Sequence, residues 1–146
     1  MTQRFAAGDA YLSDFADEVL VVCPACGGCV RVVGVAGAHR AACYACAWTR
    51  ETREPTRSYG VPYDPWLGLP LWLQTPVAGE VLWAFNAAHL TVLESYVRAD
   101  LRERGDHDPA MPRPMTDRLP RWLKSAKHRD EVLAGIARLR RRLAQP

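Results

Sequence analysis

The chain has 146 residues, of which 49% are hydrophobic and 24% charged, a composition that excludes general disorder. This length fits one medium domain, or a small metal-stapled module joined to a helical one. The net charge of +3 conceals an uneven distribution. Residues 118–146 carry nine basic and two acidic side chains, a net of +7, whereas residues 61–117 carry four basic and eight acidic ones, a net of −4. The chain therefore ends in a basic tail.

The first 22 residues contain four acids and lack the basic start and long apolar core of a secretory signal. The longest uncharged run, residues 65–79, holds three prolines and is shorter than the roughly 20 apolar residues that a membrane span needs. We therefore expect a cytoplasmic protein without membrane contact. In that reducing compartment cysteines bind metal more readily than they form disulfides.

Two Cys-x-x-Cys pairs, Cys23 with Cys26 and Cys43 with Cys46, are separated by sixteen residues. This spacing is typical of four-cysteine zinc sites, because two intervening residues let the backbone turn so that both sulfurs reach one ion. Four thiolates fill the tetrahedral shell and leave no position for a substrate. The pattern predicts one structural Zn²⁺ per chain, and the alternative is a cluster of buried or redox cysteines.

The fifth cysteine, Cys29, forms a further Cys-x-x-Cys pair with Cys26 and could replace Cys23 as a ligand. We favour Cys23, because Pro24 and Gly27 then stand where the turn needs them, Gly27 with a positive φ. Cys29 would begin the outgoing strand as a small apolar filler, and a redox role is the alternative.

Short strands are predicted around the cysteines at residues 18–22, 30–35 and 47–52, with a turn at 37–39 that makes His39 an exposed loop residue rather than a ligand. The CPxCG…CxxC pattern between Cys23 and about Thr52 resembles the zinc ribbons of the general transcription factor B type. The resemblance implies a three-stranded sheet. Ribbons of this kind contact nucleic acid in some proteins and only other proteins in many more.

Residues 53–64 are predicted to be a linker, and the PWLGLPLWLQTP segment an irregular or short helical piece. Thr75 and Pro76 are typical of a helix start, so we expect a helix near residues 76–104. Its first half is apolar nearly all round and should be central to the core. Its second half offers ion pairs at i,i+4, Glu94 with Arg98 and Asp100 with Arg104.

A last helix is expected near residues 120–143, with a break around Ser125 and an apolar stripe of Val132, Ile136, Leu139 and Leu143. The stripe could dock within the chain or against a second copy. The elements DPWLGLPLWLQT, LWAFNAAHL and LPRWLKSAKHR are similar to those of small bacterial zinc-ribbon proteins of undefined function. This second resemblance implies one unit and no activity.

The predicted fold class is α+β: a four-cysteine zinc ribbon of about three short antiparallel strands packed on a mostly α-helical C-terminal unit. The ribbon with its lead-in takes residues 1–56, the helical unit takes residues 57–146, and the two should pack as one compact body.

Asn86 and His89 are polar residues on an apolar stretch, where they form either a small recognition site or hydrogen bonds with nearby backbone. The tryptophans, including Trp66 and Trp72, either anchor an interface or fill the core. The sequence shows no phosphate-cradling loop, nucleophile elbow or metalloprotease motif, so we expect no enzyme and no small-molecule substrate.

The basic tail beside a ribbon favours a non-catalytic accessory or regulatory protein that binds nucleic acid. A solvated helix with acids at its start and arginines at its end is the plainer interpretation of the same charges. The alternative function is an adaptor that grips a larger protein complex with the ribbon edge and a tryptophan-rich surface. The candidate nucleic-acid contacts are Arg121, Lys124, Lys127, Arg129, Arg138, Arg141 and Arg142.

Overall fold

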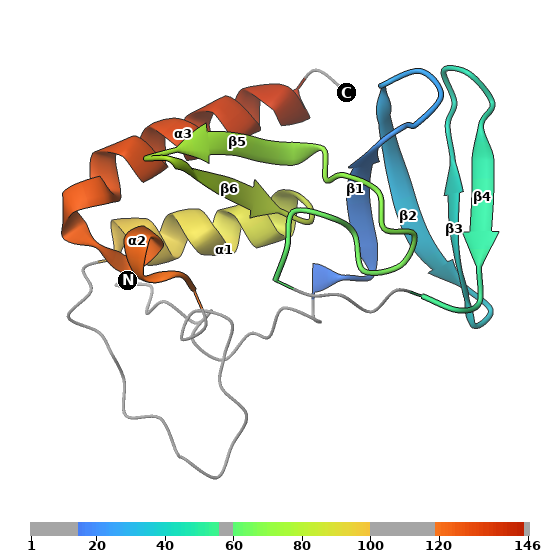
Figure 1. Ribbon diagram of the computed structural model, residues 1–146, viewed down its shortest axis with the longest axis horizontal. Coiled ribbons are helices and arrows are strands. Elements are labelled where there is room, and N and C mark those ends of the chain that lie inside the picture. Colours follow the sequence, from blue (N-terminus) through green and yellow to red (C-terminus); the bar gives the residue numbers. More distant parts are fainter. Residues whose placement is uncertain (1–14, 56–59, 100–118, 145–146) are drawn as a thin grey trace, which may run out of the picture.

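A computed structural model of the chain describes residues 15–55, 60–99 and 119–144, and it contains a four-stranded sheet, a separate β-hairpin and two long helices (Figure 1). The sheet occupies one end of the molecule, and the hairpin with the helices occupies the other. The predicted α+β class is confirmed. The elements are β1 (Glu18–Val22), β2 (Cys29–Val35), β3 (Ala38–Ala42), β4 (Thr49–Thr52), β5 (Leu73–Val77), β6 (Glu80–Ala84), α1 (Ala87–Arg98), α2 (Arg121–Lys124) and α3 (Arg129–Leu143).

The four-stranded sheet is antiparallel throughout and follows chain order, β1-β2-β3-β4. The sequence suggested about three strands, because the stretch after residue 37 was assigned to a turn. The turn lies earlier, at Ala36 and Gly37, which both have positive φ, 50° and 82°. Two consecutive residues with positive φ match the right-handed twist of a tight hairpin. The turn therefore has only these two residues, and Ala38 pairs with Val35.

One face of this sheet is packed and the other is partly open. Val19, Val21, Val30, Val32 and Ala41 point to the packed face, where they are buried with residues from the segment after the sheet. On the opposite face, Arg31 and Arg40 are exposed. Alternation along β2 produces this division, since successive side chains of a strand point to opposite faces.

Strand β1 is joined on both edges. One edge pairs with β2, and on the other the Leu20 N–H donates to the Phe85 carbonyl at 2.8 Å while the Leu20 carbonyl accepts from the Trp72 N–H at 2.9 Å. The Val22 N–H donates to the carbonyl of Pro70. The sheet is therefore hydrogen-bonded directly to the segment that leads into and out of the hairpin.

The prediction of a helix near residues 76–104 is wrong for the first half of that range. Residues 73–84 form the β5–β6 hairpin, and Thr75 and Pro76 lie within β5 rather than at a helix start. Ala78 and Gly79 form the turn with φ of 51° and 80°. The apolar run was mistaken for a buried helix because a short buried strand and a buried helical segment look alike in hydrophobicity.

Helix α1 begins at Ala87 because Asn86 caps it: the Asn86 side-chain oxygen accepts from the His89 N–H at 3.0 Å. The expected pair of Glu94 and Arg98 is present at 3.3 Å. The expected pair of Asp100 and Arg104, and the predicted end of the helix, lie outside the described residues.

The predicted break near Ser125 is confirmed. Helix α2 ends at Lys124, a single 3₁₀ turn covers Ala126–His128, and α3 starts at Arg129. The predicted stripe on α3 is buried at Val132, Ile136 and Leu139 and packs within the chain, against α1 and β5.

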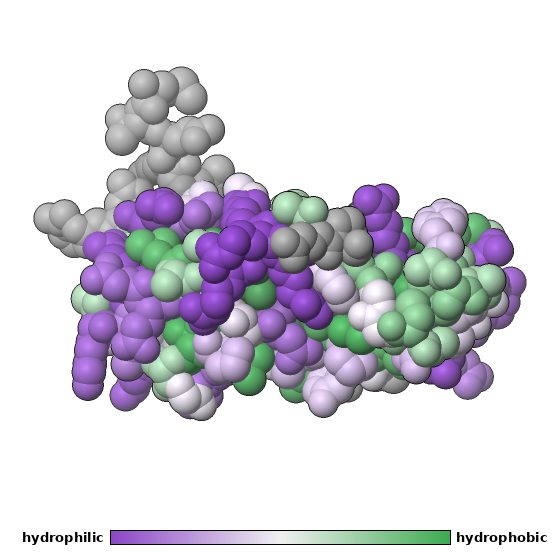
Figure 2. Space-filling view, turned by 90° about the horizontal axis from the view of Figure 1, so that it is seen from above, coloured by the Kyte–Doolittle hydropathy of each residue, from purple (hydrophilic) through white to green (hydrophobic). Residues whose placement is uncertain are grey.

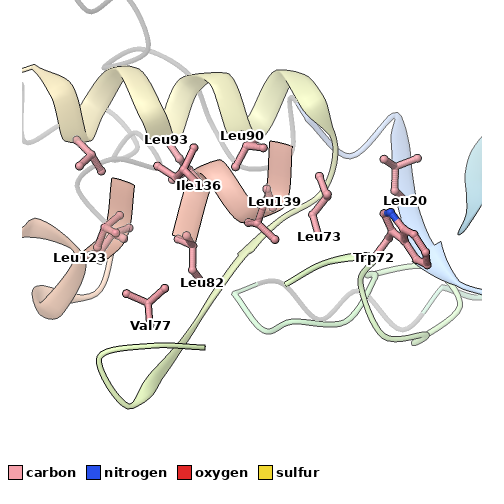
Figure 3. Packing of buried hydrophobic residues seen from close by; sticks show 13 residues of the cluster. Leu20, Trp72, Leu73, Val77, Leu82, Leu90, Leu93, Leu123, Ile136 and Leu139 are labelled. Atoms are coloured by element: carbon pink, nitrogen blue, oxygen red, sulfur yellow. The ribbon is translucent and has the colours of Figure 1, made fainter. Parts of the chain in front are cut away.

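Figure 3 shows the core between α1, α3 and the hairpin, where leucines of these elements meet and Trp72 lies next to Leu20 of β1. The Arg142 guanidinium lies 3.6 Å from the centre of the Trp72 ring, and Trp72 Nε1–H donates to the Arg142 carbonyl at 3.3 Å. The Arg142 Nε–H donates in turn to the Trp72 carbonyl. The end of α3 is thereby fastened beside β1.

Helix α3 approaches the hairpin closely at Gly135, and replacing this glycine by alanine is expected to destabilise the protein. An added Cβ would lie 2.6 Å from Val77 Cγ2 and 3.1 Å from Leu82 Cδ2. Overpacking of this kind costs about 1–3 kcal/mol, more than the ~1 kcal/mol that alanine adds in helix propensity.

Urea unfolding of Gly135→Ala measures this effect. The control is Ala134→Gly, because Ala134 is exposed on the same helix and its replacement changes propensity alone. A rise in stability of Gly135→Ala would show that the helix can move away from Val77.

Candidate metal centre

Each pair of cysteines lies on a tight turn that follows a strand. In the first turn the Cys23 N–H donates to the Gly28 carbonyl at 2.7 Å, and the Gly27 N–H donates to the Cys23 carbonyl at 2.8 Å. Gly27 has φ of 76°, as expected from the sequence. Cys23 is buried, while Cys26 is exposed.

The second turn repeats the first bond for bond. The Cys43 N–H donates to the Trp48 carbonyl at 2.7 Å, and the Ala47 N–H donates to the Cys43 carbonyl at 2.8 Å. Cys43 is buried and Cys46 is exposed, as in the first pair. We call the two turns, residues 23–28 and 43–48, the knuckles.

The knuckles bring the four predicted cysteines into one group whose sulfurs all lie within 4.8 Å of one another. Cys23 Sγ is 3.6 Å from Cys46 Sγ, and Cys26 Sγ is 3.6 Å from Cys43 Sγ. Sulfurs bound tetrahedrally to one zinc at about 2.3 Å would be about 3.8 Å apart. The donor set and its spacing therefore fit a single tetrahedral metal ion.

The pKa values of Cys23 and Cys46 are shifted in opposite directions. Burial opposes the thiolate of Cys23, but the backbone N–H groups of Cys26 and Ala25 and neighbouring thiols favour it, and its pKa falls to about 7. The Trp48 N–H favours the Cys46 thiolate, but burial and the other three sulfurs raise its pKa to about 12. Four sulfurs this close cannot all be ionised unless a cation lies between them.

Cys29 takes no part in the cluster of four. It opens β2 opposite Val22, is half-buried, and packs beside the core that contains Trp72. Burial raises the pKa of its thiol. Its position agrees with the apolar filler expected from the sequence.

Ala47 has φ of 65°, in the left-handed region that Gly27 occupies at the same place in the first knuckle. An L-residue with a Cβ is strained there by about 1 kcal/mol. Ala47→Gly is therefore expected to raise the free energy of unfolding of the metal-loaded protein by a few tenths to about 1 kcal/mol. Thermal unfolding beside Ala45→Gly, a change at an exposed neighbour, would check this, and a lower stability would contradict it.

Asn86 and His89 have structural partners. The Asn86 side-chain amide donates to the carbonyls of Phe15 at 2.7 Å and Glu18 at 2.6 Å, and His89 Nδ1 accepts from the Phe85 N–H at 2.9 Å. These bonds agree with the pairing to backbone that we weighed against a recognition site. Asn86 thereby holds the start of α1 against Glu18 of β1, and His89 binds the backbone just before the helix.

His89 gives the stability a dependence on pH. The residue is 2% exposed among the rings of Phe15, Trp83 and Phe85, and burial lowers its pKa from 6.5 to about 3. Below pH 6.5 the His89 imidazole binds a proton in the unfolded chain but stays neutral in the folded chain. Stability should fall by about 2 kcal/mol between pH 7 and pH 5 and continue to fall toward pH 3.

The measurement is chemical unfolding at several pH values for the metal-loaded protein and for His89→Asn, whose amide oxygen can replace Nδ1 as acceptor. The variant lacks the titrating ring, so its stability should fall less over the same range. Equal slopes would assign the pH dependence to other groups.

The prediction that His39 lies in an exposed turn is wrong. His39 lies in strand β3 rather than in an exposed turn, and its ring stacks on Trp66 at 3.8 Å between centroids. It lies outside the cysteine cluster.

Trp66 and Trp72 serve the interior. Trp66 is half-buried and its Nε1–H donates to the Ala16 carbonyl at 3.0 Å, while Trp72 is 7% exposed in the core. An interface built on Trp72 would need that core to open. Of the two interpretations weighed for these residues, the packing agrees with core filling.

The basic tail is largely tied to the rest of the chain. Arg129 donates to the carbonyls of Val97 and Ala99, and Arg138 donates to the Thr75 hydroxyl and the Pro76 carbonyl. Arg140 binds Glu94, whose pKa is lowered mainly by that bond. The candidate cations that are exposed and pair with no other described residue are Arg121, Lys127 and Arg141; the side chain of Lys124 lies outside the described part.

Two residues that matter in the structure, Tyr44 and Asp64, are not among the candidates predicted from the sequence. Tyr44, between the cysteines of the second knuckle, is fully exposed at 101%. Asp64 is 1% exposed, and its carboxylate accepts from the N–H groups of Trp66, Leu67 and Leu69 at 2.9, 2.6 and 2.7 Å. The Asp-Pro dipeptide before Trp66 is typical of a turn and would have located Asp64.

The chain matches no protein-family model, no curated protein and no solved structure. Within the described residues, no helix has both the length and the apolar character to cross a membrane. Fold and site together define an α+β protein with a four-cysteine cluster suited to a structural metal ion.

Proposed function

We propose that the cluster binds one zinc ion and that the four-stranded sheet is a zinc ribbon. The thiolate set, its tetrahedral spacing and the repeated knuckles support this. Iron also accepts a tetrahedral set of four thiolates, so the metal content of protein grown with both metals is the test. About one zinc per chain and no visible absorption from iron is the expected result.

We propose further that the protein is a non-catalytic adaptor that docks a partner protein with the knuckle end of the ribbon. The full exposure of Tyr44 carries this proposal, because a bare aromatic side chain fixed on a rigid turn is typical of an interface anchor. Pro24, Ala25 and Ala45 are exposed beside it. Since Trp66 and Trp72 are used inside the fold, the adaptor surface differs from the tryptophan-rich one expected from the sequence.

A comparison of three immobilised zinc-loaded proteins tests the adaptor. The wild type, Tyr44→Ser and Val81→Ser are exposed to extract of the cells that carry the gene, and retained proteins are quantified by mass spectrometry. Val81 is a matched control because it is 43% exposed and lies in the hairpin, away from the ribbon (Figure 1).

We expect at least one protein to be retained by the wild type and by Val81→Ser but lost with Tyr44→Ser. If every retained protein binds all three equally, the knuckle end is not the docking surface. Metal content and circular dichroism of the variants show that the change at Tyr44 leaves the fold intact.

Nucleic-acid binding remains a second candidate, favoured by the exposed cations Arg121, Lys127 and Arg141. Anisotropy of labelled single- and double-stranded oligonucleotides across a salt series tests it. Affinity should fall steeply with salt, and Arg141→Gln should reduce the salt slope by about 1. Arg138→Gln is the control, since Arg138 is already bound to Thr75 and Pro76. Absence of binding at low salt would remove this candidate.

A further inference from the structure

The segments that form the two knuckles contribute no charged side chain. Residues 22–30 and 41–49 contain no Asp, Glu, Lys or Arg. In Figure 2, pale green atoms gather at the end of the molecule formed by the ribbon, whereas purple dominates the helical end. The exposed surface of the knuckles therefore consists of small apolar groups, backbone, the sulfurs of Cys26 and Cys46, and the ring of Tyr44.

The metal centre beneath this surface is negative. Four thiolates around one divalent ion leave a net charge of −2. The contacts that the sulfurs make within the described residues are with one another and with backbone N–H groups, such as that of Ala25 on Cys23 at 3.4 Å. Cys26 and Cys46 are exposed, so part of this charge faces solvent.

The cations that follow the two knuckles in the sequence already have partners. Arg50 lies over the ring of Trp48 at 5.4 Å, and Arg31 pairs with Glu18 at 3.5 Å. The knuckles thus combine a negative centre, which no charged side chain of residues 22–30 and 41–49 offsets, with an aromatic ring whose face attracts cations.

We infer that the knuckle end recognises a cationic protein segment, one that presents an arginine or lysine between small apolar residues. This inference rests on the adaptor function proposed above and specifies the chemistry of its partner. The cation would lie over the Tyr44 ring near the exposed sulfurs, and the apolar neighbours would cover Ala25 and Ala45. The negative centre repels phosphate, so a nucleic acid would have to bind elsewhere.

Selection of peptides tests the inference. A displayed library of random twelve-residue peptides is selected on the zinc-loaded wild type after depletion on Tyr44→Ser. Selected peptides are then synthesised with a fluorescent label, together with versions in which each arginine is replaced by citrulline, a neutral side chain of nearly the same shape. Affinities are measured by anisotropy for the wild type, Tyr44→Ser and Val81→Ser.

We expect selected peptides rich in arginine or lysine, with affinity about tenfold weaker for Tyr44→Ser and for the citrulline versions, and unchanged for Val81→Ser. Affinity should also fall as salt rises. Neutral or acidic peptides that still require Tyr44 would overturn the cationic specificity and leave the adaptor standing. Peptides that bind Tyr44→Ser equally, or no selected peptide at all, would overturn both.

Discussion

Loss of the metal is expected to unfold the four-stranded sheet. A sheet of this size buries little apolar surface, and structural zinc contributes of order 10 kcal/mol to small domains of this kind. Cys43→Ser removes a buried member of the cysteine cluster. If the cluster binds zinc as proposed, the variant should hold less than about a tenth of the zinc of the wild type and lose the four-stranded sheet. Zinc release measured with a colorimetric chelator, and the dispersion of amide signals in NMR spectra, report the two losses.

Cys29→Ser is the matched control for this experiment, since Cys29 is a half-buried cysteine outside the cluster. It should keep one zinc per chain and lose at most the small packing contribution of a thiol. Cobalt substitution adds a spectroscopic check, because four thiolates in tetrahedral geometry give intense visible absorption. A Cys43→Ser protein that stays folded without metal would show that the surrounding core suffices.

The second large effect is expected at Asp64. Its buried carboxylate accepts hydrogen bonds from three backbone N–H groups, and truncation to alanine would remove all three bonds. The bond from Leu69 is buried and those from Trp66 and Leu67 are partly buried. An unsatisfied buried donor costs about 1–3 kcal/mol, so Asp64→Ala should lose about 3 kcal/mol of stability. Urea unfolding followed by tryptophan fluorescence measures the loss.

Asp64→Asn separates the hydrogen bonds from the charge. Its amide oxygen can still serve Trp66 and Leu67, but its NH₂ group faces the N–H of Leu69, so an intermediate loss is expected. Asp17→Ala, at an exposed acid, controls for the change in net charge. If Asp64→Ala unfolds at the same urea concentration as the wild type, water must satisfy the three donors.

The knuckles could be predicted from the sequence because their geometry is local. Two residues between the cysteines define each turn, and in the first knuckle Gly27 after the second cysteine adds a further local signal. The apolar stripe on α3 could be predicted as well, because its period of 3.6 residues persists for several turns. Both predictions depend on residues that are neighbours along the chain.

The hairpin of residues 73–84 could not be read in the same way. VLWAFNAAHL has no charge, and its strand half and its helix half each place apolar residues in the core, so hydrophobicity does not divide them. Two local signals mark the division: Gly79 at the turn and Asn86 as the helix cap. Each is weak alone, because glycine also occurs within helices and asparagine within cores.

The partners of the arginines and tryptophans were beyond sequence reasoning. Arg142 and Trp72 are seventy residues apart, yet each bonds the backbone of the other. A count of charges assigns Arg142 to the basic tail, but in the structure its guanidinium covers the ring of Trp72. Contacts of this kind depend on the relative placement of whole elements, which local patterns do not specify.

The double attachment of β1 bears on how the ribbon can be handled experimentally. A fragment cut after Thr52 would retain all four cysteines and could still be loaded with metal. Its first strand, however, would present an open apolar edge in place of the bonds from Leu20 to Phe85 and Trp72. Such an edge invites pairing with other copies. The ribbon is therefore not portable by itself, and a transplantable version has to carry residues 69–85 as its cover.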